Sequence, residues 1–294
     1  GIQNTAIGTK ALFCNTTANN NTAVGYNSLL NNTTGADNTA IGRDALKLNT
    51  TAAQNVAIGT CALYTTTTGA NNTSVGNYSS KLNTTGLNNV SVGYAALCSN
   101  TTGQQNVAVG KSAGDVTTTG SNNIMIGKGS DADAVGTNNV IAMGENVVSI
   151  LNAFTFGAGG NDSRIAFGAT SITAPSDMRL KEDIQDDTAG LSFINDLRPV
   201  TYKWRQEKDI PEEMRTHVAG STKRYNNDKV NHGFIAQEVK EAIDKHPELK
   251  DGFDMWTEES TMDGRQRVAE GALIPMLVKA IQELKAEIEL LKNK

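Results

Sequence analysis

The segment SDMRLK (176–181) places a hydroxyl and an amine close together in the chain, on Ser176 and Lys181. A serine hydroxyl becomes a nucleophile only beside a base, and a lysine accepts a proton only when burial lowers its pKa. The two residues are five positions apart, which is neither one face of a helix nor one face of a strand, so a turn or bulge must bring them together. Taken alone, the segment favours a solvated strand end over a catalytic pair.

Other patterns that resemble cofactor or metal sites are weak. Cys14, Cys61 and Cys98 are odd in number and lack zinc-ligand spacing, so they predict neither a disulfide framework nor a zinc site. The segment from Asp131 to Ala142 begins like a calcium loop, but it lacks the acid at its fifth position and the bidentate glutamate at its end. No phosphate-binding loop or His-Glu-x-x-His motif occurs, and the sequence predicts no cofactor and no metal.

Charge divides the chain into two parts. Residues 1–175 carry 14 charged side chains, whereas residues 176–294 carry 43, together with both tryptophans and all three histidines. We therefore expect a domain boundary near Pro175. The net charge of −5 argues against a nucleic-acid partner, and no apolar run is long enough to predict membrane insertion. No secretory leader is visible in the first residues, and the chain starts at Gly1 rather than Met, so an upstream part is expected.

Residues 1–144 repeat with a period of 17, and each unit contains a segment such as NTAIG (4–8). A period this short predicts a solenoid in which each unit is one coil. Alternating residues before the repeat glycine predict a short strand, the glycine a turn, and the Asn-Thr-Thr-Gly segments an outer loop. The regular Ile or Val before each glycine argues against a disordered tract. The repeat glycines are Gly8, Gly25, Gly42, Gly59, Gly76, Gly93, Gly110, Gly127 and Gly144.

Each coil is expected to bury little, namely one Ile or Val, one Ala and in some coils one Leu. These side chains are too few to fill a wide core within one chain. We therefore infer an obligate homo-oligomer whose copies cover one another's apolar strips, although the period does not set the number of copies.

The N-x-A-[IV]-G-x-x-A-L coils of residues 1–144 resemble the head repeats of trimeric autotransporter adhesins and of related phage and viral fibre proteins. Those heads are left-handed parallel β-rolls assembled from three chains, with a slightly shorter unit. The resemblance implies a trimeric parallel β-roll here. After it, the alternating apolar residues of 145–175 predict a β-rich neck of short strands.

Residues 176–294 predict an α+β domain. Helical spacing occurs over 187–197, where Asp187 or Thr188 is the expected cap, and again over 232–247, while PVTYKWR (199–205) alternates like a strand.

A long helix is expected over 272–292, with the a/d seam of a coiled coil. Isoleucine at a with leucine at d favours two strands, and so short a seam can also pack on its own domain, so the seam leaves the oligomer number open. The seam residues are Ile274, Leu277, Ile281, Leu284, Ile288 and Leu291.

Four motifs, SDMRLKEDI, DLRPVTYKW, HGFIAQEV and LIPMLVKAIQELKAEIE, resemble in order the C-terminal intramolecular chaperone domain of phage endosialidases, tail fibres and neck appendages. A relative of that domain lies in a eukaryotic membrane-bound transcription factor. The resemblance covers 176–294 and implies a domain that trimerises, drives folding of the preceding fibre and then cuts itself off. It implies cleavage between Pro175 and Ser176, with Ser176 as nucleophile and Lys181 as base. His232 is a candidate helper, with a buried structural histidine as the alternative.

The sequence thus predicts the C-terminal region of a viral tail fibre or spike, made in the host cytoplasm and built into the virion. Its expected activity is single-turnover self-cleavage, and its expected partners are its own copies in a homotrimer and a host-surface receptor or glycan. A bacterial trimeric surface adhesin with the same chaperone is one alternative. A glycan-degrading tailspike fragment is another, but paired carboxylates are needed for that chemistry, and Asp and Glu are sparse in 1–175.

Overall fold

The computed structural model describes residues 1–169, 171–214, 216–249, 253–258 and 266–293. The chain divides into two compact units, Gly1–Leu180 and Lys181–Lys294. The expected fold class is confirmed for the single chain, since a β-solenoid of 17-residue coils precedes small sheets, helices and a long C-terminal helix. The expected segments 1–144, 145–175 and 176–294 stay a prediction.

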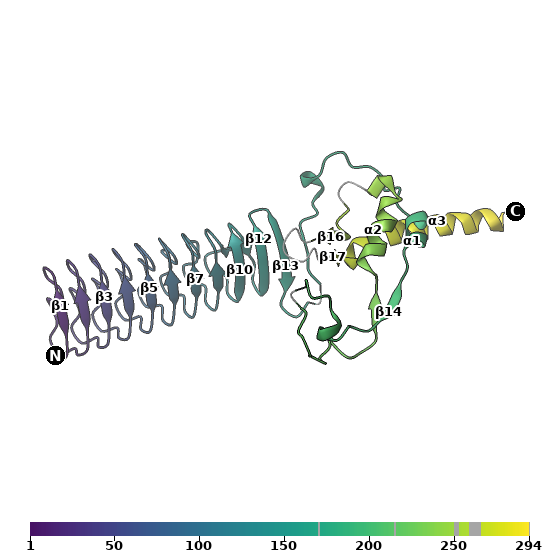
Figure 1. Cartoon of the computed structure of the whole chain (residues 1–294). Helices are drawn as coiled ribbons and strands as arrows, with labels where there is room; N and C mark the ends of the chain where they lie inside the picture. Colours follow the sequence, from purple (N-terminus) through teal and green to yellow (C-terminus); the bar gives the residue numbers. More distant parts are fainter. Residues whose placement is uncertain (170, 215, 250–252, 259–265, 294) are drawn as a thin grey trace. The chain divides into compact units, whose positions relative to one another are not determined.

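The first eight coils each place one three-residue strand in a single parallel sheet, and Figure 1 shows these strands stacked along the unit. Neighbouring strands pair with an offset of one repeat, so that Thr22 lies beside Thr39 and Ala23 beside Ala40. The 17-residue period of the sequence therefore equals the offset between paired residues of neighbouring strands. The strands are β1 (Thr5–Ile7), β2 (Thr22–Val24), β3 (Thr39–Ile41), β4 (Val56–Ile58), β5 (Thr73–Val75), β6 (Val90–Val92), β7 (Val107–Val109) and β8 (Ile124–Ile126).

The same sheet continues beyond the regular repeats. Strands β10 (Val140–Glu145) and β12 (Ala153–Ala158) extend it in parallel, and β13 (Asn161–Ala166) pairs antiparallel with β12 at its end. Strands β9 (Asp131–Ala132) and β11 (Val148–Ser149) form a separate parallel pair. The short strands expected over 145–175 therefore belong mostly to the solenoid sheet.

The interior of each coil is narrow. Side chains alternate along a strand, and here the central alanine points inward while its neighbours point outward. Ala57 and Leu63 are fully buried, whereas Ile58 is 37% exposed. The expectation that the Ile or Val before the glycine is buried is wrong, because only a small side chain fits opposite the leucine. Where Met125 replaces the alanine, Gly114 replaces the leucine, and a Cβ on Gly114 would lie only 2.8 Å from Met125 Cε.

Buried asparagines fill the rest of each coil. Asn55 donates from its side-chain amide to the Gly69 carbonyl (3.0 Å) and accepts from the backbone N–H of Asn72 (2.9 Å), one coil further on. The same pattern links successive coils and satisfies buried backbone groups. One chain therefore encloses its own alanines, leucines and asparagines, and the expected homo-oligomer stays a prediction. The row comprises Asn21, Asn38, Asn55, Asn72, Asn89, Asn106 and Asn123.

The repeat glycines mark the end of each strand, as expected. Gly59 has a φ of 135°, and a Cβ on it would lie 2.5 Å from the carbonyl oxygen of Gly76 in the next coil. Both the backbone conformation and the close approach of the coils therefore require glycine there.

Asp131 interrupts the apolar interior. It lies two repeats after Leu97 at the equivalent position of its coil, and only 4% of its surface is exposed. Its carboxyl accepts hydrogen bonds from the backbone N–H groups of Val116 (2.9 Å) and Ala132 (2.8 Å). Burial, together with the neighbouring Asp115, raises the pKa of Asp131 to about 7. Among the described residues no cluster of three metal-binding side chains occurs.

Asp131 is expected to make stability depend on pH. A carboxyl whose pKa is raised on folding holds its proton while the unfolded chain releases it, so stability falls as pH rises from about 4 to about 7. We expect Asp131→Asn to remove this slope and to stabilise the protein at pH 8 by about 2–4 kcal/mol. Urea unfolding at pH 5 and pH 8 measures the effect, with Asp37→Asn, at an exposed site, as the matched control. An unchanged slope in Asp131→Asn would contradict this assignment.

The second unit contains small elements around a compact core. Phe193, Val239 and Met255 are buried at its centre. Its strands are β14 (Val200–Tyr202), β15 (Asn231–Gly233), β16 (Trp256–Glu258) and β17 (Gln266–Val268), and its α-helices are α1 (Leu191–Asp196), α2 (Ala236–Asp244) and α3 (Ile274–Lys292). Single 3-10 turns are η2 (Glu207–Asp209), η3 (Pro247–Leu249) and η4 (Glu270–Leu273).

Helix α1 is shorter than expected and is capped from a distance. Neither Asp187 nor Thr188 caps it; instead the Leu191 backbone N–H donates to Glu283 Oε2 of α3 (2.7 Å). Gly190 makes room for this carboxylate, because a Cβ at that position would collide with it. A negative charge at a helix N-terminus is stabilising, so α3 holds α1 in place.

The prediction of a helix over 232–247 is wrong about where the helix begins. His232 belongs to β15, which pairs antiparallel with β14, and α2 starts only at Ala236. Ile235 is therefore an exposed residue before the helix, while Val239 and Ile243 are buried as the helical spacing predicts.

Helix α3 carries two apolar faces. Met276 and Ala280 pack against the core of the unit. The six residues of the predicted seam lie beside this face and are 42–69% exposed. The alternative that the seam packs on its own domain is therefore wrong for the single chain.

Candidate active site

Pro175 and Ser176 lie at the end of the first unit in an extended segment without regular secondary structure, and both are exposed. A 3-10 turn, η1 (Met178–Leu180), follows directly. Asp177 holds this turn, since its carboxylate accepts from the backbone N–H (2.9 Å) and the guanidinium of Arg179. The hydrogen bonds from Arg179 lower the pKa of the Asp177 carboxyl. A turn thus stands where the five-residue spacing requires one.

Lys181 follows the turn and opens the second unit. Its side chain is exposed in the single chain. A lysine that acts as a base must be desolvated, and solvent exposure does not provide this condition. The arrangement of a single chain therefore presents the bond and both candidate groups to solvent.

His232 lies in β15 opposite Thr201 and is exposed, so the alternative of a buried structural histidine is wrong. It lines a hollow of about 450 Å³ together with Thr201 and Glu270. An imidazole and a carboxylate in one hollow can both accept and release protons, which suits a helper in proton transfer.

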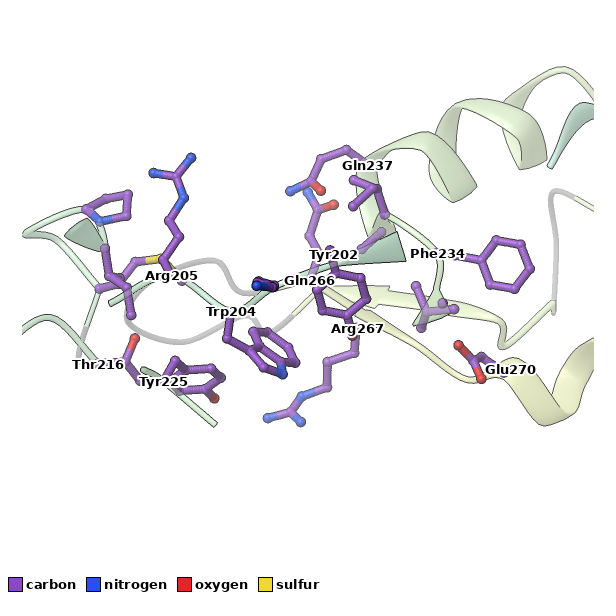
Figure 2. Close-up of a pocket in the computed structure, with 18 residues that line it drawn as sticks. Tyr202, Trp204, Arg205, Thr216, Tyr225, Phe234, Gln237, Gln266, Arg267 and Glu270 are labelled. Atoms are coloured by element: carbon purple, nitrogen blue, oxygen red, sulfur yellow. The ribbon is translucent and has the colours of Figure 1, made fainter. Parts of the chain in front are cut away.

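A larger open pocket of about 660 Å³ lies in the same unit. Trp204 packs edge-to-face between Tyr202 and Tyr225, with ring centroids 5.2 Å apart in both pairs. Figure 2 shows Trp204 and Tyr225 at one end of this pocket and Glu270 at the other. The buried Trp204 Nε1 has no hydrogen-bond acceptor among the residues that the structure describes.

The alternation over 199–205 predicts a strand, which the structure ends at Tyr202, but it does not predict the pocket that Tyr202 and Trp204 line. Tyr225 and Glu270 were also missed, because neither lies in a periodic segment or a short motif. They reach the pocket only through tertiary folding.

His246 has a structural role. Its ring nitrogens lie 3.0 Å from the carboxylates of Asp196 and Glu248, and it packs edge-to-face on Phe193. Burial disfavours its charge, but the hydrogen bonds to both carboxylates outweigh this effect and raise the pKa of His246. The imidazole ring therefore links the end of α1 to η3 through these two carboxylates.

Residues 176–247 match the model of a peptidase family described as the chaperone of endosialidase. The chain carries a chaperone-of-endosialidase domain. The match begins at Ser176 and includes Lys181 and His232, and it implies self-cleaving peptidase activity in general terms. Together with the β-solenoid, this domain fits a protein of the tail-fibre or spike type.

Two further comparisons add no relative. No curated protein and no solved structure matches the chain. Within the described ranges, none of the helices is long and apolar enough to cross a membrane.

Proposed function

We propose that the chain is the C-terminal region of a viral tail fibre or spike, whose chaperone domain gathers three copies, guides the coils into register and then cuts the bond between Pro175 and Ser176. The observation that carries this proposal is that each unit of the single chain exposes an apolar stripe. The seam of α3 is one stripe, and the outer face of the solenoid sheet is the other.

The outer face of the sheet is continuous over the coils. In most strands the residue before the glycine is 37–40% exposed, as in Ile41, Ile58 and Val92, while Val24 and Val75 are half-buried. Regularly spaced apolar side chains at one position favour association, because their burial removes apolar surface from water. Copies aligned in register would cover this face along its length.

The repeat explains why a chaperone is useful. Parallel pairing between strands far apart in the chain forms slowly and leaves strand edges exposed during folding. Each 17-residue coil also resembles its neighbour so closely that chains could associate with a shift of one coil. A domain that joins the copies at one end sets the starting register. Its removal afterwards makes unfolding kinetically slow, because the nucleating element is gone.

Ser176 and Lys181 are the proposed catalytic pair. The Ser176 hydroxyl attacks the carbonyl carbon of Pro175 while Lys181 accepts its proton. The peptide C–N bond then breaks, the Ser176 nitrogen takes up a proton, and an ester joins the Pro175 carbonyl to the Ser176 oxygen. Water hydrolyses this ester to a Pro175 carboxylate and a free Ser176 N-terminus, and His232 is the proposed helper in moving protons.

The exposure of Lys181 suggests that cleavage waits for assembly. The lysine becomes an effective base when surrounding chains remove it from water. The cut then follows gathering of the copies rather than preceding it, as a self-releasing chaperone needs.

The released shaft is proposed to attach the virion to a host-surface receptor or glycan. A glycan-degrading spike is disfavoured, since the paired carboxyls Asp115 and Asp131 do not line a cleft; Asp131 is buried and bound by backbone amides. A bacterial surface adhesin with the same chaperone remains the second candidate, because the same exposed faces fit it.

Production of the full chain tests the proposal directly. We expect a native mass of three chains, and a gel that shows a fragment whose N-terminus is Ser176. A monomer or a dimer would contradict the trimer. Chains that assemble and stay intact would remove self-cleavage and leave the chaperone role.

A further inference from the structure

The aromatic and basic side chains of the coils occupy only a few positions of the repeat. Every one of them in residues 1–144 is the first, second or fifth residue after a repeat glycine. The aromatic members are Phe13, Tyr26, Tyr64, Tyr78 and Tyr94. The basic members are Lys10, Arg43, Lys47, Lys81, Lys111 and Lys128. We call this set the tyrosine–lysine band.

Exposure alone does not explain the band. The Asn-Thr-Thr-Gly loop is exposed as well, for example at Thr34, Thr51 and Thr85, yet it holds no aromatic or basic residue. A solenoid needs small residues inside and turn residues at its corners, and it does not need tyrosine at one corner. The segregation therefore points to a function of this surface.

The band is continuous across neighbouring coils. Lys47 Nζ lies 5.3 Å from the ring centroid of Tyr64, and Lys81 Nζ lies 5.4 Å from that of Tyr78. Tyr78 also packs edge-to-face on Tyr94 of the next coil, with centroids 5.9 Å apart. Because coils stack at strand spacing, about 4.8 Å, aromatic rings and cations alternate at short intervals along the unit.

Charge at the band is mainly positive. The acidic residues at the same three positions are Asp44, Asp115 and Glu145; Asp44 pairs with Lys47 at 3.1 Å, and Glu145 pairs with Lys128 at 2.6 Å. Six basic side chains thus stand against three acidic ones, which leaves a net positive charge. Half of Tyr94 is exposed to solvent, so rings as well as cations are accessible.

We propose that the tyrosine–lysine band binds a negatively charged polysaccharide. Tyrosine rings offer flat apolar faces for the C–H faces of sugar rings, and their hydroxyls reach the sugar hydroxyls. Lysine and arginine pair with the carboxylates of acidic sugars. The band names the ligand class for the attachment role proposed above and rests on that role.

The test uses the assembled full chain and three polymers: alginate, uncharged dextran and double-stranded DNA. We expect wild type to bind alginate in isothermal titration and not to bind dextran. Lys81→Gln with Lys111→Gln is expected to weaken alginate binding about tenfold through two lost ion pairs, and Tyr94→Ala about fivefold through lost stacking. Thr51→Ala with Thr85→Ala on the other loop is the matched control and should leave binding unchanged.

Three results would overturn the inference. The first is that wild type assembles and is cut correctly but does not bind alginate. This result would leave the proposed assembly and cleavage standing. Another is equal binding of dextran. The third is equal binding of alginate and DNA with no effect of Tyr94→Ala, which would show unspecific charge attraction. Native mass spectrometry measures assembly of the chain, and a gel measures its cleavage. A failure in either of these measurements counts against the proposed function and not against the tyrosine–lysine band.

Discussion

A Ser176→Ala chain is expected to assemble and remain at its full 31.1 kDa, whereas wild type yields a fragment that begins at Ser176. Alanine has no hydroxyl to attack the Pro175 carbonyl, so the cleavage rate should fall on the order of a thousandfold or more. Ser176 is exposed in a segment without regular structure, and the substitution therefore should not disturb folding. Gel electrophoresis and N-terminal sequencing of the purified product measure the result.

Lys181→Ala should have the same outcome, because the hydroxyl then lacks its base. Ser171→Ala and Lys208→Ala are matched controls: both residues are exposed, lie elsewhere in the chain and should leave cleavage unchanged. A cut at the same bond in Ser176→Ala would show that this hydroxyl is not the nucleophile. A normal cut in Lys181→Ala would assign the base to another residue, and His232 would then be the first to test.

Ile281→Asp combined with Ile288→Asp is expected to keep the chain monomeric and uncut. Ile281 is 65% and Ile288 49% exposed on the seam of α3, so a single chain tolerates the change. In the proposed assembly the same positions of the copies would face one another, and burying aspartates there costs several kcal/mol for each copy. Native mass spectrometry gives the number of copies, and a gel of the same sample gives the cleaved fraction.

Leu290→Asp is the matched control for the seam. It introduces the same charge on an exposed leucine of α3 that lies off the seam, so assembly and cleavage should persist. Circular dichroism checks that α3 remains helical in both proteins. A double variant that still forms trimers would exclude the seam as the interface. A monomer that is cut at the normal rate would show that Lys181 needs no partner chain.

Local patterns in the sequence were sufficient for several features. The 17-residue spacing of glycines predicted the coils and the register of the sheet, because stacked identical units can pair only with their equivalents. The motif order predicted the chaperone domain, which the family match confirms over residues 176–247, and its extension to residue 294 stays a prediction. The seam of α3 was also visible, since a heptad pattern depends only on residue type and spacing.

Other features required the tertiary structure. The burial of the strand alanine was predicted correctly, but that of the following Ile or Val was not, because the leucine and asparagine elsewhere in the coil leave room for only a small inward side chain. His232 became a strand residue through pairing with Thr201, which overrides its helical surroundings.

The sequence by itself determined the repeat and the order of the two units, since each depends on residues that are close in the chain, whereas the candidate pair Ser176 and Lys181 came from the resemblance and stays a prediction. Only the tertiary structure decided which apolar residues lack a partner within one chain, how Glu283 caps α1 and where Glu270 meets the aromatic pocket. These contacts join residues far apart in the chain, and their formation depends on the packing of whole elements rather than on any local pattern.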